Sequence, residues 1–297
     1  MARIPEEKEW TRKELQRKIK WTRRFMPILE LFLQQTGKVI GKELYLDTEE
    51  GKVRVLFHGE NQKKMQPLYV NMHGGGFTAG DAEADEVYME RLAKQAGIKI
   101  CNIDYSLAPE YPFPTALNQC YAVTLYLKEH AEDFGIDSDR IAIGGHSAGG
   151  NLAAAVTLMD QDRQLLKIKA VIMDYPPMDI YTDPYLKHQP RGCIPPGMAR
   201  IANDCYLQPK KARKNPLVSP VFAEIEQLKN FPTSLIITAS GDILCKETED
   251  FKELLINAGC EVEFKRFEAA HGFTHKKGRM AEEAWNMMGE YLKRKLY

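Results

Sequence analysis

The sequence predicts an α/β fold in which a mostly parallel sheet is flanked by helices and covered at one edge by a helical cap. From about residue 42 onward, short apolar runs of strand length alternate with helical stretches. This order is typical of parallel sheets buried between helices. Residues 178–214 interrupt the alternation, because they are rich in proline and charged residues and contain no clear strand.

The elements divide the chain into a core and two cap segments. Residues 1–40 are expected to form N-terminal cap helices, because apolar residues recur at helical spacing between residues 6 and 34, with a break at Pro27. The acidic side chains among the basic ones favour a helix packed on the protein over one that lies on a membrane. Residues 41–177 and 215–297 supply the core, and residues 178–214 form a cap insertion.

Strands and helices follow one another through the core in a regular order. The first two strands, near 44–46 and 53–57, are joined by a turn that ends at Gly51. Further strands are predicted at the apolar runs 68–72, 98–103, 141–143, 170–173, 235–238 and 262–267. Helices are predicted near 84–96, 117–131, 148–160, 246–258 and 280–295.

The composition indicates which classes of partner and which cellular compartment are expected. The 41 basic and 41 acidic side chains cancel, so no long-range field favours nucleic acid. No stretch approaches the roughly 18 apolar residues of a membrane span, and the charged N-terminus does not resemble a secretory signal. The six cysteines form no C-x-x-C pair. We therefore expect a cytoplasmic protein with reduced thiols, without a nucleic-acid partner or a membrane span; composition leaves the oligomeric state open.

The strongest local signal is the run Gly145-His146-Ser147-Ala148-Gly149. It follows the apolar residues 141–143 and precedes a helical stretch, which is the strand–turn–helix context of a nucleophile elbow. Glycine suits the two outer positions because a side chain there would collide with neighbouring elements. Ser147 is therefore the candidate nucleophile.

A second motif lies at the end of another predicted strand. His73-Gly74-Gly75-Gly76-Phe77 directly follows residues 68–72. Glycines let the backbone approach a substrate closely, so such a loop can present N–H groups to a developing oxyanion. We call residues 73–77 the glycine loop.

A nucleophilic serine needs a base, and the base needs an orienting carboxylate. His271 follows the predicted strand 262–267, and Asp242 follows the strand 235–238, so both lie at carboxyl ends of strands. His275 is four residues further on and is expected at the surface. The pair His271 and His275 has a spacing that can bind a metal, but no third ligand accompanies it, so no metal or cofactor is predicted.

Together these motifs resemble those of the hormone-sensitive-lipase-like bacterial esterases, which have the α/β-hydrolase fold. The resemblance rests on His73 to Phe77, Tyr105 to Glu110, Gly145 to Gly150, Asp242 to Glu247 and His271 to Phe273, in this order. It implies Ser147, Asp242 and His271 as a catalytic triad and the backbone N–H groups of Gly75, Gly76 and Ala148 as oxyanion donors. The segment 105–110 is implied to support the site.

Two residues depart from the family pattern. His146 stands where the family usually has aspartate, and Ser106 stands where it usually has arginine. These departures weaken any inference of substrate preference from the family. The side chain of His146 should point away from the serine hydroxyl, which argues against a role as the base. Phe77, His146 and Phe273 are candidate substrate-binding residues.

The sequence therefore predicts a cofactor-independent serine esterase that acts on a small-molecule ester with a short acyl chain. A non-catalytic binding protein of the same fold is the alternative, and the presence of His271 in its expected motif argues against it. An amidase or acyltransferase with the same triad stays open, because specificity depends on the pocket. Acetylated sugars, xenobiotic esters and small lipids all remain candidate substrates.

Overall fold

The computed structural model describes residues 5–6, 8–20, 23, 40–59 and 65–297. Within them, eight strands form one sheet in the spatial order β1-β2-β4-β3-β5-β6-β7-β8. The strands are β1 (Lys42–Thr48), β2 (Gly51–His58), β3 (Gln66–Met72), β4 (Lys99–Asp104), β5 (Ile136–His146), β6 (Ala170–Asp174), β7 (Thr233–Gly241) and β8 (Val262–Ala270). β2 pairs antiparallel with β1 and with β4, and the other neighbouring pairs are parallel.

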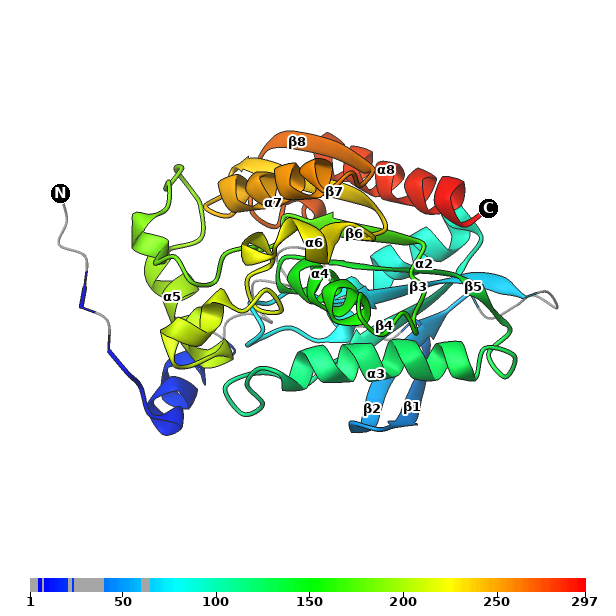
Figure 1. Ribbon diagram of the computed structural model, residues 1–297, viewed down its shortest axis with the longest axis horizontal. Helices are drawn as coiled ribbons and strands as arrows, with labels where there is room; N and C mark the ends of the chain where they lie inside the picture. The colour runs from blue at the N-terminus through cyan, green and yellow to red at the C-terminus, as the bar shows by residue number, and fades with distance from the viewer. Residues whose placement is uncertain (1–4, 7, 21–22, 24–39, 60–64) are drawn as a thin grey trace.

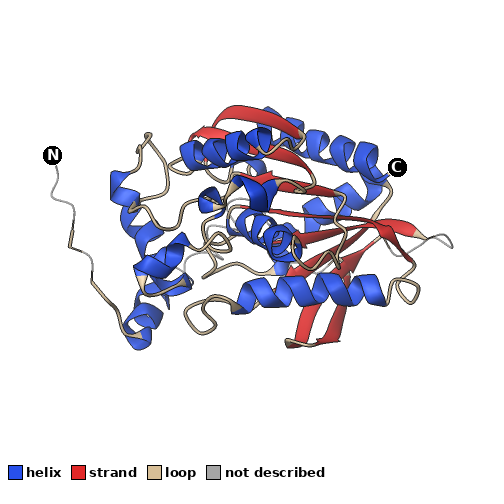
Figure 2. Cartoon of the chain, in the orientation of Figure 1, coloured by secondary structure: helices blue, strands red, loops and turns tan. Residues whose placement is uncertain are grey.

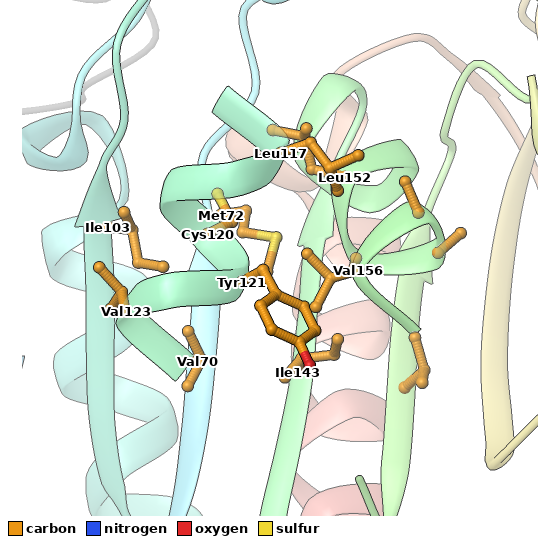
Figure 3. Close-up of a cluster of buried hydrophobic side chains, with 14 of the residues drawn as sticks. Val70, Met72, Ile103, Leu117, Cys120, Tyr121, Val123, Ile143, Leu152 and Val156 are labelled. Carbon is orange, nitrogen blue, oxygen red and sulfur yellow. The ribbon is translucent and has the colours of Figure 1, made fainter. Parts of the chain in front are cut away.

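Helices cover both faces of this sheet (Figures 1 and 2). One face carries α3 (Thr115–Glu129), α4 (Ala148–Asp160), α6 (Ile225–Leu228) and α7 (Cys245–Asn257), and the other carries α2 (Glu86–Ala96) and α8 (Arg279–Leu296). Side chains alternate between the two faces along each strand. Val70 and Met72 of β3 pack with Leu117 of α3 and Leu152 of α4, as Figure 3 shows, whereas Tyr69 packs on the opposite face.

Short 3₁₀ turns link several of these elements. They are η1 (Ala82–Asp85), η2 (Pro184–Leu186), η3 (Lys210–Lys214), η4 (Pro220–Phe222) and η5 (Phe273–His275). Two of them, η1 and η5, lie on the α2 and α8 face of the sheet, where they bring polar side chains to its carboxyl edge. None of the helices in the described part of the chain is both long and apolar enough to traverse a bilayer.

The segments expected to form the cap lie together at one end of the sheet (Figure 1). Residues 12–20 are helical, and the 178–214 segment contains α5 (Pro196–Tyr206). Leu15 and Ile19 pack against Cys205 of α5, and Trp10 Nε1 donates a hydrogen bond to Asp204 at 3.1 Å. The apolar spacing near the N-terminus therefore reflects packing between these two segments.

The predicted α/β class is confirmed, with differences at element ends. β5 begins at Ile136, earlier than the apolar run 141–143, because Asp137 to Arg140 continue the strand with partly exposed polar side chains. The predicted N-terminal helix is observed over residues 12–20; Pro27 and the rest of that prediction lie outside the described residues.

Candidate active site

Ser147 lies at the sharp turn between β5 and α4. Its φ of 52° and ψ of −124° are rare for a residue with a side chain, and this strained backbone is the conformation predicted for a nucleophile elbow. The flanking glycines are required by space, because a Cβ at Gly145 or Gly149 would lie 2.2 or 1.8 Å from the Met72 carbonyl oxygen. The Ser147 N–H donates to the Asp174 carbonyl at 2.8 Å, which fixes the turn against β6.

Two side chains from other loops meet the Ser147 hydroxyl. The distance between Ser147 Oγ and His271 Nε2 is 3.0 Å, and that between His271 Nδ1 and Asp242 Oδ2 is 2.5 Å. Asp242 follows β7, is buried, and also accepts the Leu244 N–H at 3.1 Å. The structure thus brings the three residues selected from sequence into one hydrogen-bonded line, Ser147–His271–Asp242.

The glycine loop lies beside this line. Gly75 has a φ of 119°, and a Cβ there would lie 1.9 Å from the Ala79 carbonyl oxygen, so the loop requires glycine. Within the described residues, the N–H groups of Gly75, Gly76 and Ala148 donate to no protein acceptor. Ala148 is the first residue of α4, where an N–H has no partner within the helix. The three N–H groups proposed from sequence are therefore free to bind an anion.

The segment 105–110 contacts the glycine loop and the N-terminal segment. The Tyr105 hydroxyl donates to the His73 carbonyl at 2.8 Å, and the two rings stack at 4.1 Å. Arg23 donates to the Thr78 carbonyl at 2.7 Å and forms an ion pair with Glu110 at 2.7 Å. Tyr105 thus holds the first residue of the glycine loop, and Arg23 holds the residue that directly follows it.

Comparison with known proteins places the chain in a family. A family model described as alpha/beta hydrolase fold matches residues 69–275. The chain is 30% identical over 224 residues to "Esterase LipI" of Mycobacterium tuberculosis, covering 74% of this chain and 70% of that protein. It is 42% identical over 95 residues to the hormone-sensitive lipase of Mus musculus, covering 32% of this chain and 12% of the lipase.

This chain belongs to the hormone-sensitive-lipase-like esterase family of the α/β-hydrolase fold. A solved esterase from Pyrobaculum calidifontis has a similar structure, with a TM-score of 0.83 and 26% identity over 95% of this chain and 96% of the other. Several other relatives are matched over little more than half of their own length.

Beneath the elbow, this esterase-family member has a buried polar cluster that the sequence did not predict. His146 Nε2 lies 3.1 Å from the Asp85 carboxylate, and His275 Nε2 lies 3.1 Å from the same Oδ1 atom. Asn71 Nδ2 donates to the other Asp85 oxygen at 2.9 Å. Because Asp85, Asn71 and His146 come from separate elements, no local motif marks the cluster in the sequence.

The buried groups of this cluster have shifted pKa values. Burial opposes ionisation of Asp85, but the adjacent His146 and the hydrogen bonds from both histidines hold the pKa of Asp85 below its usual range. Burial acts to lower the pKa of His146, but the charge and hydrogen bond of Asp85, together with the charge of Asp174, outweigh burial and raise that pKa. Burial lowers the pKa of His275 to about 4, and nearby His146 acts in the same direction. Asp85 is thus ionised and His275 neutral near pH 7.

Asp174, the β6 partner of His146 across the sheet, holds a proton more readily than a typical carboxyl group. Burial raises the pKa of Asp174 to about 7. Thr274 donates to one of its oxygens at 2.9 Å, and the other oxygen has no partner among the described residues. The Tyr175 hydroxyl lies 2.6 Å from the Thr274 hydroxyl and 3.1 Å from His275 Nδ1. These bonds connect the end of β6 to η5, which follows His271 in the chain.

The prediction that His275 lies at the surface is wrong. The residue is 5% exposed, because η5 turns inward and packs the His275 ring edge-on against the stacked rings of Tyr88 and Trp285. The ligand atoms of Asp85, His146 and His275 lie within 4.8 Å of one another, a spacing that also occurs around metal ions. The Gly74 N–H, however, points at His146 Nε2 at 3.1 Å. A donor aimed at that lone pair fits a hydrogen-bonded cluster, so we do not assign a metal site.

The three candidate substrate-binding side chains are largely buried. Phe77 stacks on Tyr206 of α5 at 3.8 Å, and Phe273 packs near Phe267 at 5.0 Å on the α8 face. His146 lies under the glycine loop. Their contact with a substrate stays a prediction, and each is held firmly by its protein neighbours.

Proposed function

We propose that this protein is a serine carboxylesterase that hydrolyses esters of short-chain acids through an acyl-enzyme intermediate on Ser147. Membership in the esterase family supports the reaction class. The observation that carries the mechanism is the continuous line from Ser147 Oγ through both ring nitrogens of His271 to Asp242, at 3.0 and 2.5 Å.

In the first half-reaction, Ser147 Oγ attacks the ester carbonyl carbon while His271 Nε2 takes the hydroxyl proton. Asp242 accepts from Nδ1–H, so the ring presents its free Nε2 to the serine and its positive charge is stabilised as it forms. The tetrahedral oxyanion binds the free N–H groups of Gly75, Gly76 and Ala148. Each such donor contributes about 3 kcal/mol to stabilising the transition state.

In the second half-reaction, the intermediate is hydrolysed. His271 first gives its proton to the departing alcohol oxygen, which breaks the ester C–O bond and leaves the acyl group on Ser147. A water molecule then attacks the acyl carbonyl as His271 takes its proton, and the returned proton releases the acid and regenerates the serine hydroxyl.

The contacts of α5 with the glycine loop favour short acyl groups. A Cβ at Gly76 would lie 3.5 Å from the Ala202 side chain, and Phe77 stacks on Tyr206. The segment before α5 contains several prolines and charged side chains, not the long apolar surface of a lipid-binding lid. Each methylene buried in a fitting pocket contributes about 0.8 kcal/mol, so preference should rise with acyl length until the pocket ends.

A panel of p-nitrophenyl esters from acetyl to palmitoyl tests this proposal. We expect kcat/KM to be highest between acetyl and hexanoyl esters and to fall for longer chains. Ser147→Ala should lower kcat by about 10⁴ or more, because the nucleophile is lost. The control Ser240→Ala removes an exposed hydroxyl and should leave kcat unchanged.

Faster cleavage of palmitoyl than of butyryl ester would contradict the short-chain assignment. A folded Ser147→Ala variant with wild-type rates would contradict the nucleophile. Binding of esters without any turnover by the wild type would favour the non-catalytic alternative.

A further inference from the structure

The Nε2 atom of His146 contacts two groups, one of which requires it to be protonated and the other unprotonated. It lies 3.1 Å from the Gly74 nitrogen and 3.1 Å from Asp85 Oδ1. A backbone N–H can only donate, and an ionised carboxylate can only accept. Without a proton, Nε2 accepts the Gly74 hydrogen bond; with a proton, it donates to Asp85 and can no longer accept. One nitrogen cannot serve both partners at once.

The two partners differ in what else they bind. Asp85 keeps donors from His275 at 3.1 Å and from Asn71 at 2.9 Å when His146 is unprotonated. The Gly74 N–H has no other acceptor among the described residues. Protonation of His146 therefore costs Gly74 its hydrogen bond, whereas deprotonation leaves Asp85 satisfied.

Gly74 occupies a sensitive position in the proposed active site. It directly precedes Gly75 and Gly76, which supply two of the proposed oxyanion donors, and His146 directly precedes Ser147. The contact is close, since a Cβ at Gly74 would lie 2.9 Å from His146 Cδ2. A change in the protonation of His146 Nε2 therefore acts directly on Gly74, which is adjacent to the proposed oxyanion donors.

We propose that His146 is a positioning residue that anchors the glycine loop through Gly74, and that a proton on its Nε2 moves this hydrogen bond to Asp85 and loosens the loop. The kinetic consequence rests on the proposed ester hydrolysis. It predicts that the acid side of the activity profile contains two ionisations, one from His271 as base and one from His146 as anchor.

The charged and titratable groups around His146 determine when this change occurs. They are Asp85 of η1, Asp174 of β6, Tyr175 directly after β6, and His275 of η5. The charge and hydrogen bond of Asp85 and the charge of Asp174 together outweigh burial and raise the pKa of His146. Removing the Asp85 charge should lower the pKa and keep the glycine loop anchored in more acidic solution.

Three variants separate anchoring from packing. His146→Gln offers an acceptor near the position of Nε2 that does not titrate. His146→Met has a similar volume and no strong acceptor. Asp85→Asn removes the competing charge and retains the shape of the side chain. In each, kcat and KM are measured from about pH 5 to 9 with a butyryl ester, and folding is checked by circular dichroism at every pH.

For the wild type we expect the slope of log kcat/KM against pH to approach two in acid. His146→Gln should keep most of the kcat at alkaline pH and show a slope of one. His146→Met should lose about 10- to 100-fold in kcat with KM within about twofold, because a displaced loop weakens binding of the oxyanion more than of the substrate. Asp85→Asn should move one ionisation down by roughly one to three pH units.

Equal kcat values for His146→Gln and His146→Met at alkaline pH, or an acid slope that stays near two in both variants, would overturn the proposal. A readout independent of turnover is the Gly74 amide resonance of ¹⁵N-labelled Ser147→Ala protein, which should shift as the His146 ring titrates. A Gly74 resonance that ignores this titration would overturn the anchor. If the wild type cleaves no ester, the proposed function fails, and the resonance still decides whether His146 holds Gly74.

Discussion

Two histidine–aspartate pairs lie close to Ser147 and differ in their surroundings. In the pair His271–Asp242, the histidine side chain is 19% exposed and its second nitrogen faces the Ser147 hydroxyl. In the pair His146–Asp85, the histidine side chain is 9% exposed and its Nε2 faces the backbone of the glycine loop. Both aspartates are fully buried.

The two pairs differ in which histidine nitrogen contacts the aspartate and in which nitrogen remains available to another group. Asp242 binds Nδ1 of His271 and leaves Nε2 free for proton transfer. Asp85 binds Nε2 of His146, the same atom that Gly74 needs. In our proposal, the pair His271–Asp242 moves a proton during the reaction, and a proton on the pair His146–Asp85 alters the position of the glycine loop.

The largest expected contrast comes from removing each aspartate charge in turn. Asp242→Asn should lower kcat by about 10⁴, because the amide cannot hold His271 in the tautomer that accepts the serine proton. Asp85→Asn should change kcat by less than about tenfold at alkaline pH, since it touches no reacting atom. Steady-state kinetics on both variants with the same ester measures this difference. Similar losses in the two variants would show that the pairs are not functionally distinct.

A smaller expected difference concerns the stability contributed by Asp174, the β6 partner of His146 across the sheet. Burial raises the pKa of Asp174 from 3.8 to about 7, so the folded state holds a proton that the unfolded chain releases. This stabilisation is fully present below about pH 4 and is lost as the pH rises through 7. Asp174→Asn does not titrate, so relative to wild type it should gain up to about 4 kcal/mol between pH 4 and pH 8.

Urea unfolding at both pH values measures this gain. The control Asp162→Asn alters an exposed carboxyl and should show no comparable pH dependence. An Asp174→Asn difference that is the same at both pH values would mean that Asp174 is already ionised in the folded protein.

The smallest expected effect is that of chelation. His146 and His275 each contact Asp85, His146 also accepts the Gly74 N–H, and the proposed triad needs no ion. Dialysis against EDTA should therefore leave kcat/KM unchanged. Activity that falls on chelation and returns with zinc would instead assign this cluster as a metal site.

The parts of the site that short motifs encode could be predicted from the sequence. Ser147 and the glycine loop lie where strands end in glycine-rich turns, and Gly145 and Gly149 are required by their contact with Met72. The alternation of strands and helices predicted the α/β class for the same reason, because both signals are local. Asp242 and His271 were found because each follows a predicted strand at the same edge of the sheet.

The second pair could not be predicted, because its residues are distant in the sequence and share no motif. Asp85 meets His146 and His275 only when η1 and η5 fold onto the same face of the sheet. The prediction of an exposed His275 failed for this reason: its exposure depends on α2 and α8, which supply Tyr88 and Trp285. The departure from the family pattern at His146 marked the position without showing what it contacts.

The most direct test of the central claim is the mass of the intact protein during turnover of a p-nitrophenyl ester. After rapid mixing and acid quenching, we expect the protein to gain the mass of one acyl group, and peptide mapping to place it on Ser147. Ser147→Ala should gain none, and Asp242→Asn should acylate far more slowly. Ester turnover with no acylated protein, or an acyl group on another residue, would contradict the account.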